Sequence, residues 1–292
     1  MNIEPGKTTV GFIGLGVMGQ SMAHHIFNAR YELHVYTRTK KSAKTIIAKG
    51  AVWEDCVSEL SRKCDLIITI VGFPADIEQV YFTENGILNN AKKGTVLIDM
   101  TTSSPELAVK IYNQAKEKGI ESLDAPVSGG DLGAKNATLS IMAGGDIDIF
   151  NKVMPIFKIM GKNIQFQGKA GAGQHTKISN QIAIAAGMIG VCESIAYAEK
   201  AGLYPETVLK SIGQGAAGSW SLNNLGPRII AKDFEPGFFI KHLIKDMKIA
   251  AKSSQDLQLK TPGLDLALSL YKKLAEKGFE NKGTHALYKL FK

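Results

Sequence analysis

Three glycines directly after an apolar run place the tightest constraint on what this chain can fold into. Residues 10–13 have the composition of a buried strand and residues 22–29 have a helical pattern, and between them Gly14, Gly16 and Gly19 follow the spacing G-x-G-x-x-G. In this setting the first glycine forms a tight turn, the second lets the backbone approach a pyrophosphate, and the third allows close helix–strand packing. The turn is therefore expected to bind a dinucleotide cofactor. The residues assigned to it are Gly14, Gly16, Val17, Met18 and Gly19.

Strand and helix patterns alternate from residue 9 to residue 168. Apolar runs rich in β-branched residues alternate with amphipathic stretches, which is typical of a mostly parallel sheet with helices on both faces. The predicted strands cover residues 10–13, 33–36, 66–71, 96–100, 122–125, 139–143 and 163–166. The segment Ser103-Ser-Pro-Glu106 predicts a helix start, and Gly119 predicts the end of that helix.

After Gly173 the strand patterns stop, and the remaining patterns are helical. The predicted helices cover residues 174–201, 205–213, 240–257 and 262–277. A second G-x-G-x-x-G, at residues 213–218, follows a helix instead of a strand and is predicted to be a loop. The fold class is therefore an α/β Rossmann domain with a mostly parallel sheet over residues 1–170, followed by an all-α domain over residues 171–292. Residues 182–191 have no charge on any helical face, which favours burial in that domain or in a homo-oligomer, a dimer or tetramer.

The residues after the second predicted strand bear on the choice of cofactor. An NAD-binding chain would carry an Asp or Glu here, to hold the ribose 2′-hydroxyl. This chain instead has Thr37, Arg38 and Thr39, and a guanidinium can hold a 2′-phosphate through two hydrogen bonds. We therefore predict that NADP(H) is preferred over NAD(H). The alternative is a solvated basic turn in which Thr39 caps the following helix.

Composition narrows the class of protein further. The net charge is +8, but only four of the 35 basic residues are arginines and the lysines are scattered, so no nucleic-acid partner is expected. The three cysteines have no metal-ligand spacing, which predicts reduced thiols and no metal site. The uncharged residues 178–192 are too few for a membrane span, and the first residues lack a signal-peptide pattern. We expect no membrane partner and a cytoplasmic location.

Hydride transfer needs a second group that moves a proton, and two lysines are candidates. Tyr112 and Lys116 have the Y-x-x-x-K spacing of short-chain dehydrogenases, but they precede much of the predicted sheet and suit a helical surface pair. Lys177 follows a glycine-rich linker, and Asn180 and Gln181 lie on the same helical face. From helical spacing alone, an ordinary surface lysine is the stronger interpretation of Lys177.

Four motifs in a fixed order favour a catalytic role for Lys177 instead. The glycine turn, Asp124-Ala-Pro-Val-Ser-Gly-Gly130, Gly171-x-Gly173-x-x-x-Lys177 and Lys245-Asp246 together resemble the β-hydroxyacid dehydrogenase family over essentially the whole chain. The resemblance implies a 6-phosphogluconate dehydrogenase-like helical domain, and it makes Lys177 the general acid and base. It also implies that Ser128, Gly129, Gly130, Asn180 and Gln181 bind a small substrate that carries a carboxylate. Thr102, Lys245 and Asp246 would bind the cofactor.

The resemblance implies an NAD(P)-dependent oxidoreductase that interconverts a small β-hydroxy acid and its semialdehyde, as 3-hydroxyisobutyrate dehydrogenase does. Glyoxylate, succinic semialdehyde or tartronate semialdehyde reduction is the alternative within this class. A non-catalytic nucleotide-binding regulatory protein is the alternative of another class, and the presence of Lys177 favours the enzyme. The family usually has Asn where this chain has Gln181, which leaves the substrate open. Residues 219–221 and Arg228 are predicted to lie in a loop, with Arg228 as a carboxylate clamp or part of a structural ion pair.

Overall fold

The computed structural model describes residues 3–292, which form two compact units. The first unit ends at Lys177 and the second begins at Ile178, so the division falls within helix α9 (Ala172–Lys200). The predicted boundary at residue 170 lies just before this helix. The first turn of α9 contacts the sheet, as described below, so the division falls after Lys177 instead of at residue 170.

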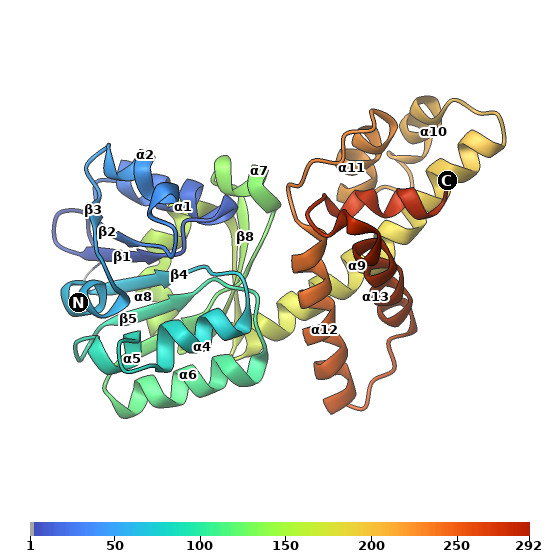
Figure 1. The fold of residues 1–292 in the computed structure, drawn as a ribbon. Helices are drawn as coiled ribbons and strands as arrows, with labels where there is room; N and C mark the ends of the chain where they lie inside the picture. The colour runs from blue at the N-terminus through green and yellow to red at the C-terminus, as the bar shows by residue number, and fades with distance from the viewer. Residues whose placement is uncertain (1–2) are drawn as a thin grey trace. The chain divides into compact units, whose positions relative to one another are not determined.

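The first unit is built on one sheet, and the prediction of a mostly parallel sheet is confirmed (Figure 1). The strand order is β3-β2-β1-β4-β5-β6-β8-β7, with β9 paired to β8. Strands β1 to β6 pair in parallel, whereas β8 runs antiparallel to β6 and β7. The strands are β1 (Thr9–Ile13), β2 (Glu32–Tyr36), β3 (Val52–Trp53), β4 (Leu66–Thr69), β5 (Val96–Asp99), β6 (Glu121–Asp124), β7 (Val127–Ser128), β8 (Leu139–Gly145) and β9 (Gly161–Gly168).

Helices cover both faces of this sheet because alternate strand residues point to opposite faces. Phe12 and Ile68 face α1 and α8, whereas Ile13 and Ile67 face α3, α4, α5 and α6. The helices of this unit are α1 (Val17–Asn28), α2 (Lys44–Ile47), α3 (Val57–Lys63), α4 (Pro74–Phe82), α5 (Ile87–Asn90), α6 (Pro105–Glu117), α7 (Gly130–Lys135) and α8 (Ile147–Met160), with a 3₁₀ turn at Lys40–Ala43. As predicted, a serine caps α6: the Ser104 hydroxyl accepts a hydrogen bond from Leu107 N–H.

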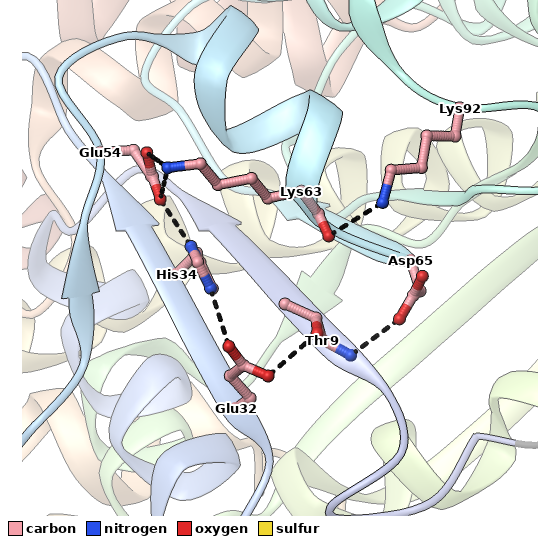
Figure 2. Close-up of polar contacts among 7 residues, drawn as sticks. All are labelled: Thr9, Glu32, His34, Glu54, Lys63, Asp65 and Lys92. Carbon is pink, nitrogen blue, oxygen red and sulfur yellow. Dashed lines mark hydrogen bonds and ion pairs between the residues drawn. The ribbon is translucent and has the colours of Figure 1, made fainter.

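Charged side chains cross-link β2 to β3 and α3 (Figure 2). His34 Nδ1 lies 2.6 Å from Glu54 Oε1, and Lys63 Nζ donates to both oxygens of Glu54 at 2.7 and 2.9 Å. Burial alone would raise the pKa of Glu54, but the hydrogen bonds from Lys63 and His34 outweigh it and lower that pKa. Glu32, the first residue of β2, extends this network through His34 Nε2. The network therefore stabilises the edge of the sheet.

The second unit consists of helices around α9. They are α10 (Pro205–Ile212), α11 (Trp220–Ile230), α12 (Ile240–Asp256) and α13 (Pro262–Leu274), followed by a π turn at Ala275–Phe279 and a 3₁₀ helix at Thr284–Leu290. Within residues 3–292, α9 is the one helix long and apolar enough to cross a membrane by length and composition. Its Ala185, Met188 and Cys192 are buried in the core of this unit. One part of the apolar surface of α9 is thus buried among its neighbours, and 44% of its apolar window is buried in all.

One predicted loop is wrong. Residues 220–230 form helix α11, and the hydroxyl of Ser219 caps it by accepting a hydrogen bond from Leu222 N–H. Arg228 Nε pairs with Asp233 Oδ2 at 2.8 Å, and its Nη2 donates to the carbonyl of Glu235 at 2.6 Å. Of the two interpretations of Arg228, the structural ion pair is therefore the one observed. The cysteines Cys56, Cys64 and Cys192 are free thiols, as predicted.

Candidate functional site

The glycine turn between β1 and α1 provides space for a ligand where the motif requires it. Gly14 has a φ of +101°, and a Cβ there would collide with the carbonyl oxygen of Ile70. A Cβ on Gly19 would collide with the carbonyl oxygen of Gly14, whereas a Cβ on Gly16 would have no atom within 4 Å. Gly14 and Gly19 are thus required by the protein's own packing. Gly16 faces open space, which fits the approach of a pyrophosphate.

The sheet topology places this turn at a crevice that suits a dinucleotide. The strand order reverses between β1 and β4, because β2 and β3 lie on one side of β1 while β4 and β5 lie on the other. Ligands of doubly wound sheets bind outside the carboxyl ends of the strands at such a reversal. Helix α1 begins at Val17 with no side-chain cap, so its first N–H groups and positive dipole end are available to phosphate oxygens.

The basic segment after β2 lies at the end of a strand beside this turn. The Arg38 side chain is 84% exposed, and its Nη1 lies 3.3 Å from Asp76 Oδ1. Asp76 also caps α4, because its Oδ2 accepts a hydrogen bond from Phe73 N–H. Thr39 precedes the 3₁₀ turn at Lys40–Ala43, but its hydroxyl makes no capping hydrogen bond. The capping alternative for Thr39 is therefore not observed.

The ends of β5 and β6 carry two buried carboxylates in register. Asp99 and Asp124 are paired residues of these neighbouring strands. Asp99 Oδ1 accepts hydrogen bonds from the hydroxyl of Thr69 and the N–H of Thr101. Burial outweighs these bonds and raises the pKa of Asp99 to about 6. Burial also raises the pKa of Asp124, against the backbone hydrogen bonds from Gly171 and Gln174.

Asp124 binds the beginning of the helix that carries Lys177. Its Oδ1 accepts from the N–H of Gly171 at 2.8 Å, and its Oδ2 accepts from the N–H of Gln174 at 2.9 Å. The side chain of Gln174 in turn bonds to the backbone of Thr101 and to that of Ser103. Lys177 lies in the second turn of α9 and is 7% exposed. Asp124 and Gln174 belong to motifs found in the sequence, but the sequence alone predicted no role for either residue.

The other predicted substrate residues of the first unit lie around a short strand. Ser128 ends β7 opposite Ser140 of β8, and Gly129 and Gly130 follow with φ values of +129° and +64°. These two positive φ values favour glycine over other residues. Thr102 lies between β5 and α6 and is half-buried.

The predicted residues of the second unit form a hydrogen-bonded chain. Asn180 Nδ2 donates to Gln181 Oε1 at 2.7 Å, and Gln181 Nε2 donates to Asp246 Oδ2 at 2.5 Å. Asp246 also pairs through Oδ1 with Lys245 Nζ at 2.8 Å. Gln181 and Asp246 are each 2% exposed. Gln181 is thus bound to protein groups, a relation that sequence reasoning did not anticipate.

The rival lysine belongs to a different part of the first unit. Lys116 Nζ donates to the hydroxyl of Tyr112 at 2.9 Å, and that hydroxyl donates to Asp146 at 2.9 Å. Lys116 is exposed on α6. These contacts are those of a helical surface pair, as the sequence favoured.

Comparison with known proteins gives consistent matches. A family model described as the NAD binding domain of 6-phosphogluconate dehydrogenase matches residues 9–168. A second, described as NAD-binding of NADP-dependent 3-hydroxyisobutyrate dehydrogenase, matches residues 171–291.

Individual relatives match over nearly the whole chain. The uncharacterized oxidoreductase YkwC of Bacillus subtilis is 61% identical, over 98% of this chain and 99% of that protein. A probable mitochondrial 3-hydroxyisobutyrate dehydrogenase-like protein of Arabidopsis thaliana is 45% identical, over 98% of this chain and 85% of its own length. The solved structure of Mycobacterium tuberculosis 3-hydroxyisobutyrate dehydrogenase with L-serine is 27% identical, with a TM-score of 0.88 over 98% of this chain and 99% of that one.

The fold, the glycine turn and these matches define an NAD(P)-dependent dehydrogenase that acts on CH–OH groups. Within that class, the chain belongs to the β-hydroxyacid dehydrogenase family.

Proposed function

We propose that this protein uses NADP(H) to interconvert a small β-hydroxy acid and its semialdehyde, with Lys177 as general acid in reduction and general base in oxidation. The observation that carries the proposal is the setting of Lys177. It is buried in the second turn of α9, and the start of that helix is bound to the ends of β5 and β6. The same edge of the sheet forms the dinucleotide crevice.

The bound nicotinamide supplies or accepts the hydride, and the protein positions the groups around it. The backbone at Gly14, Gly16 and Gly19 holds the pyrophosphate against the start of α1. Ser128 and the N–H groups of Gly129 and Gly130 orient the substrate carboxylate. Lys177 Nζ donates a proton to the substrate oxygen in reduction and accepts it in oxidation. By resemblance, Thr102 and the Lys245–Asp246 pair complete the cofactor site.

The preference for NADP(H) is supported by charge. Arg38 is the first cation after β2, and residues 37–41 include no carboxylate that would repel a 2′-phosphate. Two acidic side chains lie near this segment: Asp76 pairs with Arg38, and Asp55 lies 4.0 Å from Lys40 Nζ. The Arg38 side chain is nevertheless 84% exposed. Arg38 is therefore accessible to a phosphate.

The proposal also covers the cellular location of the protein and its oligomeric state. The described residues of the second unit expose several large side chains, among them Tyr197 at 74%, Tyr204 at 80% and Trp220 at 56%. Exposed aromatic groups of this size favour an interface between copies of the chain. We expect a cytoplasmic homo-oligomer, and light scattering after size exclusion should report a multiple of 31.5 kDa.

The test follows NADPH oxidation at 340 nm with short β-semialdehydes, succinic semialdehyde, tartronate semialdehyde and glyoxylate. Replacing Lys177 with Ala should lower kcat by about 10²- to 10⁴-fold, because proton transfer to the substrate oxygen is lost. NADPH binding, followed by fluorescence, should be unchanged. Lys169→Ala is the matched control, since Lys169 is exposed and lies before α9.

The outcomes separate the alternatives. Turnover that is fastest with a β-semialdehyde other than tartronate semialdehyde, and that collapses only in Lys177→Ala, supports the proposal. Fastest turnover with glyoxylate, succinic semialdehyde or tartronate semialdehyde would instead assign the alternative reductase activity. Tight NADPH binding without turnover on any of these compounds would point to the regulatory protein, and undiminished turnover in Lys177→Ala would refute the mechanism.

A further inference from the structure

A glutamine side chain that no part of the proposed mechanism uses is fully buried beside the candidate site. Gln174 is 0% exposed, and both ends of its amide are occupied. Its Oε1 accepts a hydrogen bond from the N–H of Ser103 at 2.9 Å, and its Nε2 donates to the carbonyl of Thr101 at 2.8 Å. The amide therefore binds the backbone on both sides of Thr102, in the segment that follows β5.

The backbone of the same residue is held from the next strand. Gln174 N–H donates to Asp124 Oδ2, at the end of β6, and Gly171 N–H donates to Asp124 Oδ1. These bonds satisfy N–H groups at the start of α9 that have no partner within the helix. A Cβ on Gly173 would collide with the carbonyl oxygen of Met142, and a Cβ on Gly144 would come within 2.7 Å of Asp124 Oδ1. The start of α9 is thus packed against the strand ends without spare room.

Gln174 and Lys177 are three residues apart on one helix, so they lie on neighbouring positions of the same face. A change in the tilt or phase of the first turn would therefore move Lys177 as well. Two side-chain hydrogen bonds of Gln174 tie this turn to the Thr101–Ser103 segment.

We infer that Gln174 is a positioning residue, which sets the location of Lys177 relative to the segment around Thr102. This inference rests on the proposed roles of Lys177 and Thr102. Misplacement of a catalytic group by about 1 Å can cost about 100-fold in rate. Loss of the Gln174 amide should therefore lower kcat while the cofactor still binds to the glycine turn.

Two substitutions separate positioning from mere packing. Gln174→Met keeps the length of the side chain and removes both hydrogen bonds. Gln174→Glu keeps the acceptor for Ser103 N–H, but when ionised it places a carboxylate oxygen against the carbonyl of Thr101. When protonated, the carboxylic acid reproduces both bonds, because its O–H can donate to Thr101 and its C=O can accept from Ser103. Activity of this variant should recover as the pH falls.

The experiment measures kcat, KM and NADPH binding from pH 6 to pH 8 for both variants, with Gln165→Met as the control. Gln165 is an exposed glutamine on β9, and its Nε2 donates a hydrogen bond to the surface residue Asn163. At pH 8 both Gln174 variants should show a kcat about 10- to 100-fold below wild type. Towards pH 6 the Gln174→Glu variant should regain activity relative to Gln174→Met, while NADPH binding stays unchanged.

Amide hydrogen exchange of the substrate-free protein gives a second readout that does not depend on turnover. In Gln174→Met, protection of the Ser103 N–H and of the first turn of α9 should fall, whereas Gln165→Met should resemble wild type. A kcat unchanged in Gln174→Met, or a constant ratio between the two Gln174 variants across the pH range, would overturn the inference. If wild type turns over none of the substrates, the proposed function fails, and unchanged exchange in Gln174→Met would then separately refute the positioning role.

Discussion

Gln181 donates a hydrogen bond from Nε2 to Oδ2 of Asp246 over 2.5 Å, so the amide expected to face the substrate is bound to a buried carboxylate. Asn at this position would be one methylene shorter and would leave that carboxylate oxygen without its donor. Gln181→Asn should therefore lower the free energy of unfolding by about 1–3 kcal/mol, measured by urea denaturation. Gln181→Glu should be worse still above neutral pH, because two carboxylates would then meet. Equal stability of wild type and Gln181→Asn would contradict this account.

A Cβ at Gly16 meets no protein atom, which separates its role from those of Gly14 and Gly19. Gly16→Ala should keep the melting temperature of the apoprotein but weaken NADPH binding by about 10-fold or more, because the methyl group occupies the space of the pyrophosphate. Gly19→Ala should unfold the turn, since its Cβ would strike the carbonyl of Gly14. Gly187→Ala is a matched control, because that helical glycine also has open space around it. Unimpaired NADPH binding in Gly16→Ala would place the cofactor elsewhere.

Asp76 pairs with Arg38 and would therefore compete with a 2′-phosphate for the Arg38 guanidinium in the proposed cofactor site. Arg38→Ala should weaken NADPH binding by about 10- to 100-fold, which corresponds to a charge-assisted hydrogen bond, and leave NADH binding almost unchanged. Asp76→Asn should shift the preference further towards NADPH, because it removes the competing carboxylate while its amide oxygen can still cap α4. Fluorescence titration with both cofactors measures these effects. A parallel loss of NADH and NADPH binding in Arg38→Ala would argue against a 2′-phosphate contact.

The buried Asp99 predicts a pH dependence of stability. Its pKa is about 6 in the folded protein against an ordinary value of 3.8, so the folded state holds the proton more tightly than the unfolded chain. The stabilisation from the protonated form is complete below about pH 4 and is lost as the pH rises through about 6. Relative to Asp99→Asn, wild type should therefore lose up to about 3 kcal/mol of unfolding free energy from pH 4 to pH 7. Urea denaturation across this range checks it, and a pH-independent difference would refute it.

The first unit could be predicted largely from local patterns. The seven predicted strands are all present. Strands β4 and β5 are apolar runs that are buried on both faces, whereas β9 alternates exposed and partly buried residues. Strands β3 and β7 escaped prediction, since each has only two residues and no hydrophobic periodicity to detect. Helix α11 was read as a loop because Gly226 and Pro227 interrupt its pattern. Its hydrophobic burial rests mainly on Leu222 and Ile229.

The candidate site was predictable only where its chemistry is local. The glycine turn is specified by residues within one strand, turn and helix, and the structure gives each glycine a distinct packing environment. The contacts of Gln174 join residues more than 70 positions apart, so no spacing rule could reveal them. Likewise, the pairing of Gln181 with Asp246 spans 65 positions and depends on how α9 packs against α12. The roles of Lys177 and Ser128 remain predictions from the family resemblance.

Each compact unit contains one buried thiol whose alkylation can report the opening of that unit. Cys64 lies in the core of the first unit and Cys192 in that of the second, and burial raises the pKa of each to about 12. A thiol of this kind does not react with an alkylating agent until its surroundings open. Mass-spectrometric counting of alkylated Cys64 and Cys192 would therefore time the opening of the nucleotide-binding unit and of the helical unit separately, in a single unlabelled sample.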